Sequence, residues 1–285
     1  MEQDRPVRRP WRWPGDARIV VSVGLAFEAF EQRSQFITSA SGAGANCFSL
    51  SYGDYGWKAG AWRLIELLEG YAIKGQVYTN GLAAHDHPEI VAAMAASGHE
   101  IVGHGWANDR PMLDSEPDAF RAEIRRCTEA LSRAAGARPV GWLSPGYGGT
   151  AESNAILAAE GYTWAGDDAS DDLPFVEDTA DGPIVIIPTP GFASNDLSNW
   201  LAPRNAPGII WDGFRDTFDV LYEEGGRGSP KWIEIVLHCH VAGRPTLIPT
   251  IRRCLDYARG HDNVLFARRR ELAEWTLEQH DGSKP

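Results

Sequence analysis

The sequence has few cysteines, and their spacing excludes two classes of protein. Only four of its 285 residues are cysteine, at Cys47, Cys127, Cys239 and Cys254, and no two of them form a CxxC pair. Zinc ribbons and disulfide-stapled secreted domains both depend on a framework of closely spaced cysteines. The sequence predicts neither of these, and it favours a protein of a reducing compartment.

Long apolar runs and linker segments are also missing. No run approaches the roughly 18 apolar residues that a transmembrane helix needs, and residues 1–16, rich in arginine, proline and tryptophan, lack the apolar core of a signal peptide. We therefore predict a cytoplasmic protein with no membrane partner. No Gly/Ser-rich, Pro-rich or charge-rich segment divides the chain, so we expect a single domain over residues 1–285, with 1–16 as an N-terminal extension.

Basic residues are in the minority. The chain has 27 lysines and arginines against 39 acidic residues, a formal net charge of −12. Nucleic acids and anionic membranes attract basic surfaces, so this balance argues against both as partners. The glycine-rich stretch 141–148 lacks the lysine of a phosphate-binding loop, which leaves nucleotide binding without support. A small-molecule substrate fits this composition better.

What the sequence does contain is an alternation of strand and helix patterns. Short β-branched runs alternate with segments whose apolar residues recur at helical spacing, and such repeated βα units predict an α/β fold with a mostly parallel sheet, most simply a barrel. The predicted strands are 18–25, 75–79, 100–103, 140–143, 162–165, 184–187, 232–237 and 264–267, and a long acidic loop precedes the strand 184–187. The predicted helices are 61–71, one from 88, one from 115 to 136, 152–160, 211–223, 247–258 and 271–279.

Polar residues gather just after the predicted strands. They are Glu28, then residues 104–109, 144–147, 167–172 and 238–244. In a barrel these loops share one mouth, so residues far apart in the sequence would meet there. The sequence therefore predicts a site built from five separate segments.

Glu28 and His104 are candidates for proton transfer. Glu28 follows the first strand in apolar and aromatic company, where we expect desolvation to raise its pKa towards neutrality. The alternative is a rim carboxylate held by a backbone donor. His104 stands between Gly103 and Gly105 at a strand end, and its alternative is a hydrogen-bonded side chain without chemistry.

His238 and His240 form a second candidate pair. In extended chain they would point the same way, which suits one metal ion or one substrate; otherwise one is packed and the other exposed to solvent. Arg244 would hold a carboxylate or a urea-like oxygen through two hydrogen bonds, or form a plain salt bridge.

Four aspartates lie close together at Asp167, Asp168, Asp171 and Asp172. They would bind a cation, orient a catalytic arginine or histidine, or cap turns, and their spacing is not that of an EF-hand. The loop 141–148, with Trp142 and Pro145, would line a pocket with its backbone amides.

Together these segments resemble the polysaccharide deacetylase family (the chitooligosaccharide deacetylase homology domain), and within it the branch of metal-independent allantoinases and cyclic-imide hydrolases. The resemblance runs from Trp13 to Trp275 and rests on residues 13–19, 52–68, 98–106, 167–174, 195–196 and 238–245. It implies a distorted (β/α) barrel of about seven parallel strands and hydrolysis of non-peptide carbon–nitrogen bonds.

The departures from the family pattern concern its metal. Its metal-dependent deacetylases carry two adjacent aspartates, the first a base and the second a ligand, and then two histidines four residues apart. By this resemblance, Glu28 and Ala29 occupy the positions of the two aspartates, and His104 and Asn108 those of the two histidines. Trp142 occupies the position of the arginine in the third motif. Alanine cannot ligate and asparagine is a weak zinc ligand, so no cofactor is expected; a divalent ion such as zinc would keep only His104, with Asn108.

We thus expect a hydrolase of a small amide, cyclic imide or ureide. Glu28 or His104 would activate water, and His238 would protonate the leaving nitrogen or stabilise the oxyanion. The alternatives are a metal-dependent carbohydrate deacetylase and a catalytically silent, ligand-binding barrel. The content of 11 tryptophans favours a homo-oligomer. The residues expected to bind substrate are Trp106, Trp142, Pro145, Asp168, Asp171, Asp172, Asp196, His240 and Arg244.

Overall fold

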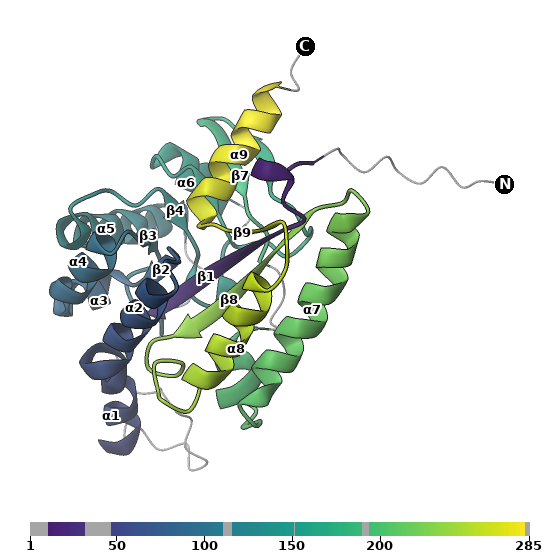
Figure 1. Ribbon diagram of the computed structural model, residues 1–285. Helices are drawn as coiled ribbons and strands as arrows, with labels where there is room; N and C mark the ends of the chain where they lie inside the picture. Colours follow the sequence, from purple (N-terminus) through teal and green to yellow (C-terminus); the bar gives the residue numbers. More distant parts are fainter. Residues whose placement is uncertain (1–10, 32–46, 111–115, 151, 190–193, 283–285) are drawn as a thin grey trace.

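A mostly parallel sheet, curled into a half-barrel and covered by helices, forms the centre of the computed structural model (Figure 1). The structure describes residues 11–31, 47–110, 116–150, 152–189 and 194–282. Eight of the nine strands follow the order β6-β7-β5-β4-β3-β2-β1-β8. The ninth, β9, pairs with the first residues of β1. This arrangement confirms the predicted α/β barrel fold.

The strands lie close to where the sequence predicts them. β3 matches its predicted range, while β1 runs two residues further than expected, and each of its nine positions is buried. The buried apolar run explains the central place of β1, which pairs in parallel with β2, β8 and β9. The bounds are β1 Ile19–Phe27, β2 Gln76–Thr79, β3 Glu100–Gly103, β4 Gly141–Trp142, β5 Trp164–Ala165, β6 Phe175–Thr179, β7 Gly182–Ile186, β8 Lys231–His238 and β9 Val264–Phe266.

One part of the predicted acidic loop is a strand. β6 pairs antiparallel with β7 through a tight hairpin, in which Gly182 has a φ of 120°. No sequence pattern indicated this strand, because the residues of β6 are half-buried or exposed and include Glu177 and Asp178. On the other side of the half-barrel, Asn195 forms an isolated parallel bridge with Val236 of β8.

Helices cover the outside of the sheet, and most match a predicted segment. α5 begins at a proline and ends at Gly136, whose φ of 74° places it in the left-handed region that glycine tolerates. Ser115, the predicted start of this helix, lies outside the described residues. The sequence analysis did not predict α1, α3 or the two π-helical segments. The bounds are α1 Cys47–Tyr55, η2 Gly56–Gly60, α2 Ala61–Gly70, α3 Gly81–Asp86, α4 Pro88–Ala96, α5 Pro117–Ala135, α6 Ser153–Ala159, η4 Leu197–Leu201, α7 Gly208–Gly226, α8 Ile248–Arg259 and α9 Arg269–Gly282, with short 3-10 turns η1 Pro14–Asp16 and η3 Pro145–Tyr147.

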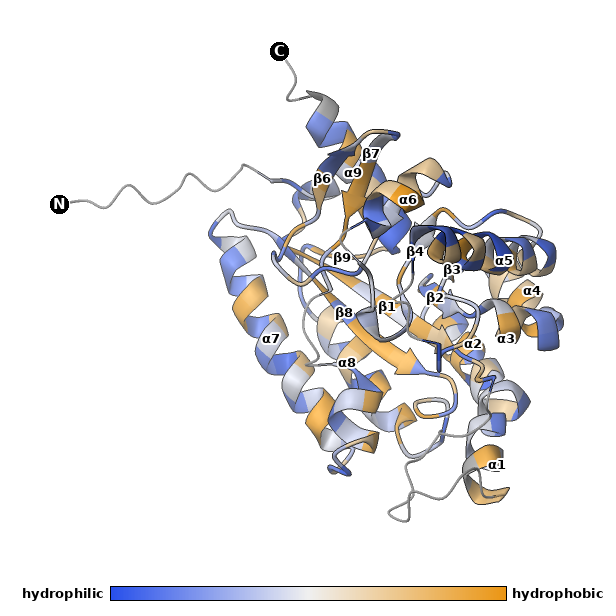
Figure 2. Ribbon diagram, turned by 180° about the vertical axis from the view of Figure 1, so that it is seen from behind, coloured by the Kyte–Doolittle hydropathy of each residue, from blue (hydrophilic) through white to orange (hydrophobic). Residues whose placement is uncertain are grey.

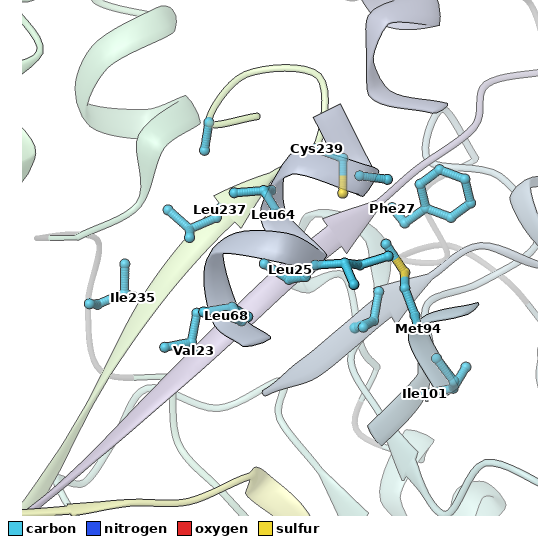
Figure 3. Close-up of a cluster of buried hydrophobic side chains, with 14 of the residues drawn as sticks. Val23, Leu25, Phe27, Leu64, Leu68, Met94, Ile101, Ile235, Leu237 and Cys239 are labelled. Atoms are coloured by element: carbon cyan, nitrogen blue, oxygen red, sulfur yellow. The ribbon is translucent and has the colours of Figure 1, made fainter. Parts of the chain in front are cut away.

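The core has two layers. The larger packs the outer face of the sheet against the helices, as where Leu64 and Leu68 of α2 meet Val23 and Leu25 of β1 (Figure 3). The strands β1 and β8 are accordingly coloured as hydrophobic, whereas the helices show mixed colours (Figure 2). The smaller layer fills the barrel interior with rings such as Trp164 and Trp232. Both faces of the sheet are therefore buried, as in other parallel sheets.

Residues 11–16, the described part of the predicted extension, pack against the body of the protein. Trp13 is buried, its Nε1 donates to the carbonyl of Lys231 at 2.9 Å, and its ring meets that of Trp275 in α9 edge-on. Residues 1–10 lie outside the described part of the chain. Of the helices that the structure describes, none combines the length and apolar character needed to span a membrane.

Candidate active site

Glu28 lies between two imidazoles at the carboxyl ends of the central strands. It follows β1, and one of its oxygens, Oε1, is 3.6 Å from Nε2 of His104 and 3.6 Å from Nε2 of His238. All three side chains are less than a tenth exposed. The structure thus brings together the three residues that the sequence analysis proposed for proton transfer.

His104 is fixed by the loops of two neighbouring strands. Its Nδ1 donates to the carbonyl of Leu143, just beyond β4, at 2.6 Å. Because a carbonyl can only accept, Nδ1 carries the proton and Nε2 is the nitrogen that faces Glu28. Asn80, at the end of β2, donates to the carbonyl of His104 and accepts the amide of Ala29 at 3.0 Å. These bonds set the height of His104 relative to Glu28.

His238 is anchored by Asp196, which the structure buries completely. One oxygen of Asp196 is 2.6 Å from Nδ1 of His238, and the other accepts the backbone amide of His238 at 2.9 Å. Asp196 immediately precedes the π-helical segment η4, and such segments are common at functional sites. The carboxylate therefore fixes both the ring and its tautomer, so that Nε2 faces Glu28.

The charges of this cluster correct one sequence-based expectation. Burial acts to raise the pKa of Glu28, but the positive charge of His238 and the contact with His104 outweigh it and lower the pKa to about 2. Burial likewise acts to lower the pKa of His238, while Asp196 and Glu28 raise it to about 9. The predicted rise in the Glu28 pKa is therefore wrong, because two imidazoles contact the carboxylate. At neutral pH Glu28 is therefore a carboxylate and His238 beside it is an imidazolium.

His240 and Arg244 lie near this cluster in positions that differ from those expected. The chain turns after His238, whose carbonyl accepts the amides of Val241 and Ala242, so His238 and His240 do not share an extended strand. Both rings are nevertheless buried, with centroids 6.0 Å apart. Burial and the charge of His238 lower the pKa of His240 to about 3, which keeps its ring neutral.

Arg244 does not form the salt bridge that was its alternative role. Its guanidinium lies 3.7 Å from the ring centroid of Tyr52 and 4.1 Å from that of Tyr55. Its Nε donates to the carbonyl of His240 and its Nη2 to that of Tyr52. No carboxylate within the described ranges pairs with it. Arg244 thus ties α1 to the loop after β8, and its binding of substrate stays a prediction.

The two tryptophans predicted to bind substrate are core residues. Trp142 is fully buried, and its ring meets Tyr162 edge-on at 5.4 Å and lies against Gly103. The ring of Trp106 lies under α5, where Arg126 stacks on it at 3.5 Å. Both side chains point to the helix layer, so their prediction as substrate ligands is corrected. Pro145 is buried at the start of η3, and its role in binding stays a prediction.

The four neighbouring aspartates separate into two kinds. Asp168 accepts the amide and hydroxyl of Ser170, and Asp171 accepts the amide of Leu173. Asp171 and Asp172 are exposed, and the bonds of Asp168 and Asp171 are those of turn-capping residues, while substrate binding by Asp168, Asp171 and Asp172 stays a prediction. Asp167 differs, because its Oδ2 is buried and its Oδ1 accepts the backbone amide of Ser144 at 2.8 Å.

Three residues near the cluster were not among the predicted site residues. Asn80 gave no signal beyond its place after a strand, and Asp167 was not distinguished from its neighbours. Tyr147 has a left-handed φ of 58°, and its side chain bonds Asn195 beside Asp196. Burial and the nearby Glu234 raise the pKa of Tyr147 to about 12, so its phenol stays protonated. The polar loop 144–147 was the available signal for this residue.

The donor set does not fit the metal of the family's metal-dependent members. The backbone N–H of Asn108 donates to the backbone carbonyl of Ala29 at 2.9 Å, so the two positions that depart from the ligand pattern are neighbours in space. A methyl group therefore stands where a ligating carboxylate is needed. Within the described part of the chain, no group of three His, Cys, Asp or Glu side chains is placed to hold a metal ion.

The chain is similar in sequence and in structure to several known proteins. Residues 41–165 match the family model described as polysaccharide deacetylase. A crystal structure named as a probable polysaccharide deacetylase, from Pseudomonas aeruginosa PAO1, is 31% identical, with a TM-score of 0.83 and 94% of each chain covered. The crystal structure of PuuE allantoinase is 28% identical, with a TM-score of 0.84, and the match covers 94% of this chain and 93% of that one. A Schizosaccharomyces pombe protein named "Putative polysaccharide deacetylase" is 27% identical, over 94% of this chain and 93% of the relative.

Proposed function

We propose that this chain, which belongs to the polysaccharide deacetylase family, uses Glu28, His104 and His238 to hydrolyse a small amide, cyclic imide or ureide. Its family makes it a hydrolase of non-peptide carbon–nitrogen bonds. The choice of a small substrate is supported by the likeness to a structure named as an allantoinase over nearly the whole chain. It is also supported by the donor set, in which Ala29 and Asn108 take the places of metal ligands.

In this proposal His104 accepts the proton of the attacking water. A general base works best when its pKa lies near the working pH, and Glu28, with a pKa of about 2, binds a proton too weakly. The hydrogen bond from Nδ1 of His104 to Leu143 fixes the ring, so that Nε2 faces the same space. The proton moves from water to this nitrogen while the water oxygen bonds to the carbonyl carbon.

His238 acts as the acid. With a pKa of about 9 it carries a proton on Nε2 at neutral pH, and Asp196 stabilises that charged form. As the carbon–nitrogen bond breaks, the leaving nitrogen keeps the bonding electron pair and takes this proton. The reaction thus leaves His104 protonated and His238 neutral.

Glu28 stabilises the proton on either histidine. Its Oε1 lies 3.6 Å from Nε2 of both rings, so its negative charge favours the imidazolium of His238 before the reaction and that of His104 after it, and proton exchange with solvent restores the starting state. Distances of this size in an enzyme without substrate often shorten when the substrate binds. The position of the Glu28 carboxylate between two anchored imidazoles is the single observation that carries the proposal.

A substrate panel assayed with and without a chelator tests this function. We expect purified protein to hydrolyse one of allantoin, hydantoin or succinimide, with a rate that a chelator leaves unchanged. Acetylated chitooligosaccharides serve as the competing substrate. Chelator-sensitive deacetylation of the sugars, with no turnover of the small compounds, would contradict the proposal.

Carbohydrate deacetylation is the second candidate. It is favoured by the names of the Pseudomonas aeruginosa and Schizosaccharomyces pombe relatives. Metal analysis separates it from the first, since about one divalent ion per purified chain would support the second candidate. A silent barrel, the third alternative, would turn over neither class of substrate.

Two further predictions concern the protein in its setting. A homo-oligomer is expected from the tryptophan content, and the mass measured by light scattering checks it. A cytoplasmic location is expected from the lack of closely spaced cysteine pairs, and fractionation of the source cells checks that.

A further inference from the structure

Asp167 lies one peptide unit from the anchor of His104. The carbonyl of Leu143 accepts Nδ1 of His104, and the amide of the next residue, Ser144, donates to Oδ1 of Asp167 at 2.8 Å. Asp167 itself comes just after β5, whose carboxyl end opens on the same side as those of β1, β3 and β8. The geometry therefore places this carboxyl beside the catalytic cluster.

The second oxygen of Asp167 has no hydrogen-bond partner among the described residues. Oδ2 is buried and lies close to Gly149, where an added Cβ would be 3.0 Å from it. A buried acceptor without a donor is costly, and native proteins rarely retain one without a reason. Burial also raises the pKa of Asp167, against the bonds from Ser144 and the charge of His104.

A purely structural role does not account for this arrangement. Asp168 and Asp171 show how aspartates in this segment cap turns, with one oxygen on a nearby amide and the side chain open to water. Asp167 accepts the backbone amide of Ser144 on Oδ1, whereas its Oδ2 is buried with no partner among the described residues. Glu28 has the same feature, since its Oε2 is buried and unpartnered in the described structure. Two acceptors flanking His104 are thus unsatisfied.

We propose that Oδ2 of Asp167 accepts a hydrogen bond from a substrate N–H and makes the enzyme selective for substrates that retain this N–H. The assignment rests on the proposed function, because it names the chemical feature by which the same site recognises an imide or ureide. Asp167 is here a specificity-determining residue. A site that buries an acceptor for a substrate N–H rejects analogues without it, since the acceptor is then left unpaired.

Calorimetric binding of hydantoin and its two N-methyl derivatives tests the assignment. Each methyl group replaces one N–H, and a Glu28→Gln background keeps the ligands intact. We expect one methyl isomer to bind at least about tenfold more weakly than hydantoin, the size expected for one unpaired buried acceptor. In Glu28→Gln/Asp167→Asn the discrimination should fall below about threefold, because the amide can keep its oxygen on Ser144 and turn a donor towards the substrate.

Two further variants serve as controls. Glu28→Gln/Asp178→Asn changes an exposed aspartate in β6 and should keep the full discrimination. Glu28→Gln/Asp167→Ala, which removes both oxygens, should lose it like the asparagine variant, and it replaces that variant if the latter does not fold.

The outcomes separate this inference from the proposed function. Unchanged discrimination in both Asp167 variants, or no binding of hydantoin to the parent, overturns the assignment. If discrimination depends on Asp167 but the wild-type protein hydrolyses none of the small compounds, the assignment stands and the proposed function fails. If the wild-type protein hydrolyses them and the Asp167 variants discriminate equally well, the function stands and the assignment fails.

Discussion

Two buried carboxylates, Glu234 and Glu28, show how differently one barrel can hold an acidic side chain. In the barrel interior, Glu234 accepts bonds from Gln76 and Tyr78 on one oxygen and from Arg269, at 2.6 Å, on the other. At the mouth, Glu28 has only contacts of 3.6 Å on one oxygen and no partner among the described residues on the other. A fully paired carboxylate stabilises a fold, whereas an underpaired one is ready to interact with a ligand. The comparison assigns stability to Glu234 and chemistry to Glu28.

Changing Glu28 should give the largest effect on activity. Glu28→Gln keeps the shape but removes the charge that orders the two imidazoles, so we expect kcat/KM to fall by about 10³-fold or more, as for members of other catalytic units. Because the lowered pKa of Glu28 means that the folded state favours its ionised form, the melting temperature should fall, but by less than in Glu234→Ala. Steady-state kinetics and thermal unfolding of the same sample provide the check, and a large loss of stability with unchanged kcat/KM would reverse the comparison.

Changing Glu234 should give the opposite result. Glu234→Ala leaves the charge of Arg269 buried and unpaired, which is expected to lower the free energy of unfolding by about 3–5 kcal/mol. Denaturant unfolding measures this. The double variant Glu234→Leu/Arg269→Met is the control, since replacing both partners should cost less than removing one; equal losses would show that the ion pair is not the cause.

Asp196→Asn sharpens the comparison at the anchor of His238. The carboxamide retains an oxygen for the backbone amide of His238 but loses the charge, so kcat/KM should fall by about 10–100-fold, as with other partners that orient an imidazole. Asp196 acts as a positioning residue, and a structural role alone would leave the pH profile unmoved. We therefore expect the alkaline limb of the profile to shift to lower pH in this variant, and an unshifted limb would contradict the assignment.

The pH profile of the wild-type protein should show the charge of His238 directly. Its pKa is raised from 6.5 to about 9, so the acid is present at neutral pH and kcat/KM should fall as the pH rises through about 9. The same shift has a consequence for stability. Its contribution is complete below about 6.5 and is lost between 6.5 and 9, because only the folded state holds the proton there. Rates and unfolding midpoints from pH 6 to 10 check both; a flat profile would rule out His238 as the acid.

The sequence predicted the strands and their ends well because a buried parallel strand has a simple pattern. β3 was predicted at its observed bounds, and Glu28, His104 and His238 could be assigned to one mouth since parallel strands end on one side. Less regular elements were missed. α1 contains Gly53 and serines, and its backbone is tied by Arg244 through Tyr52, a contact that no local pattern shows.

The details of the site depended on contacts between distant segments. Asp167 and Asp168 are adjacent, and only the amide of Ser144, on another loop, distinguishes them. Trp142 belongs to the segment 141–148, which was predicted to line a pocket, yet its side chain points to the helix layer towards Tyr162. Burial alone predicts that the pKa of Glu28 is raised. It is lowered instead, because two imidazoles from other strands contact the carboxylate.

The most direct test of the account is the ionisation of Glu28 itself. In a ¹³C NMR titration of protein labelled at the glutamate side-chain carboxyl carbon, with Glu28→Gln to assign the signal, we predict that Glu28 stays ionised until the pH falls towards 2. A midpoint between pH 6 and 7 would contradict the claim that His104 and His238 hold it as a carboxylate.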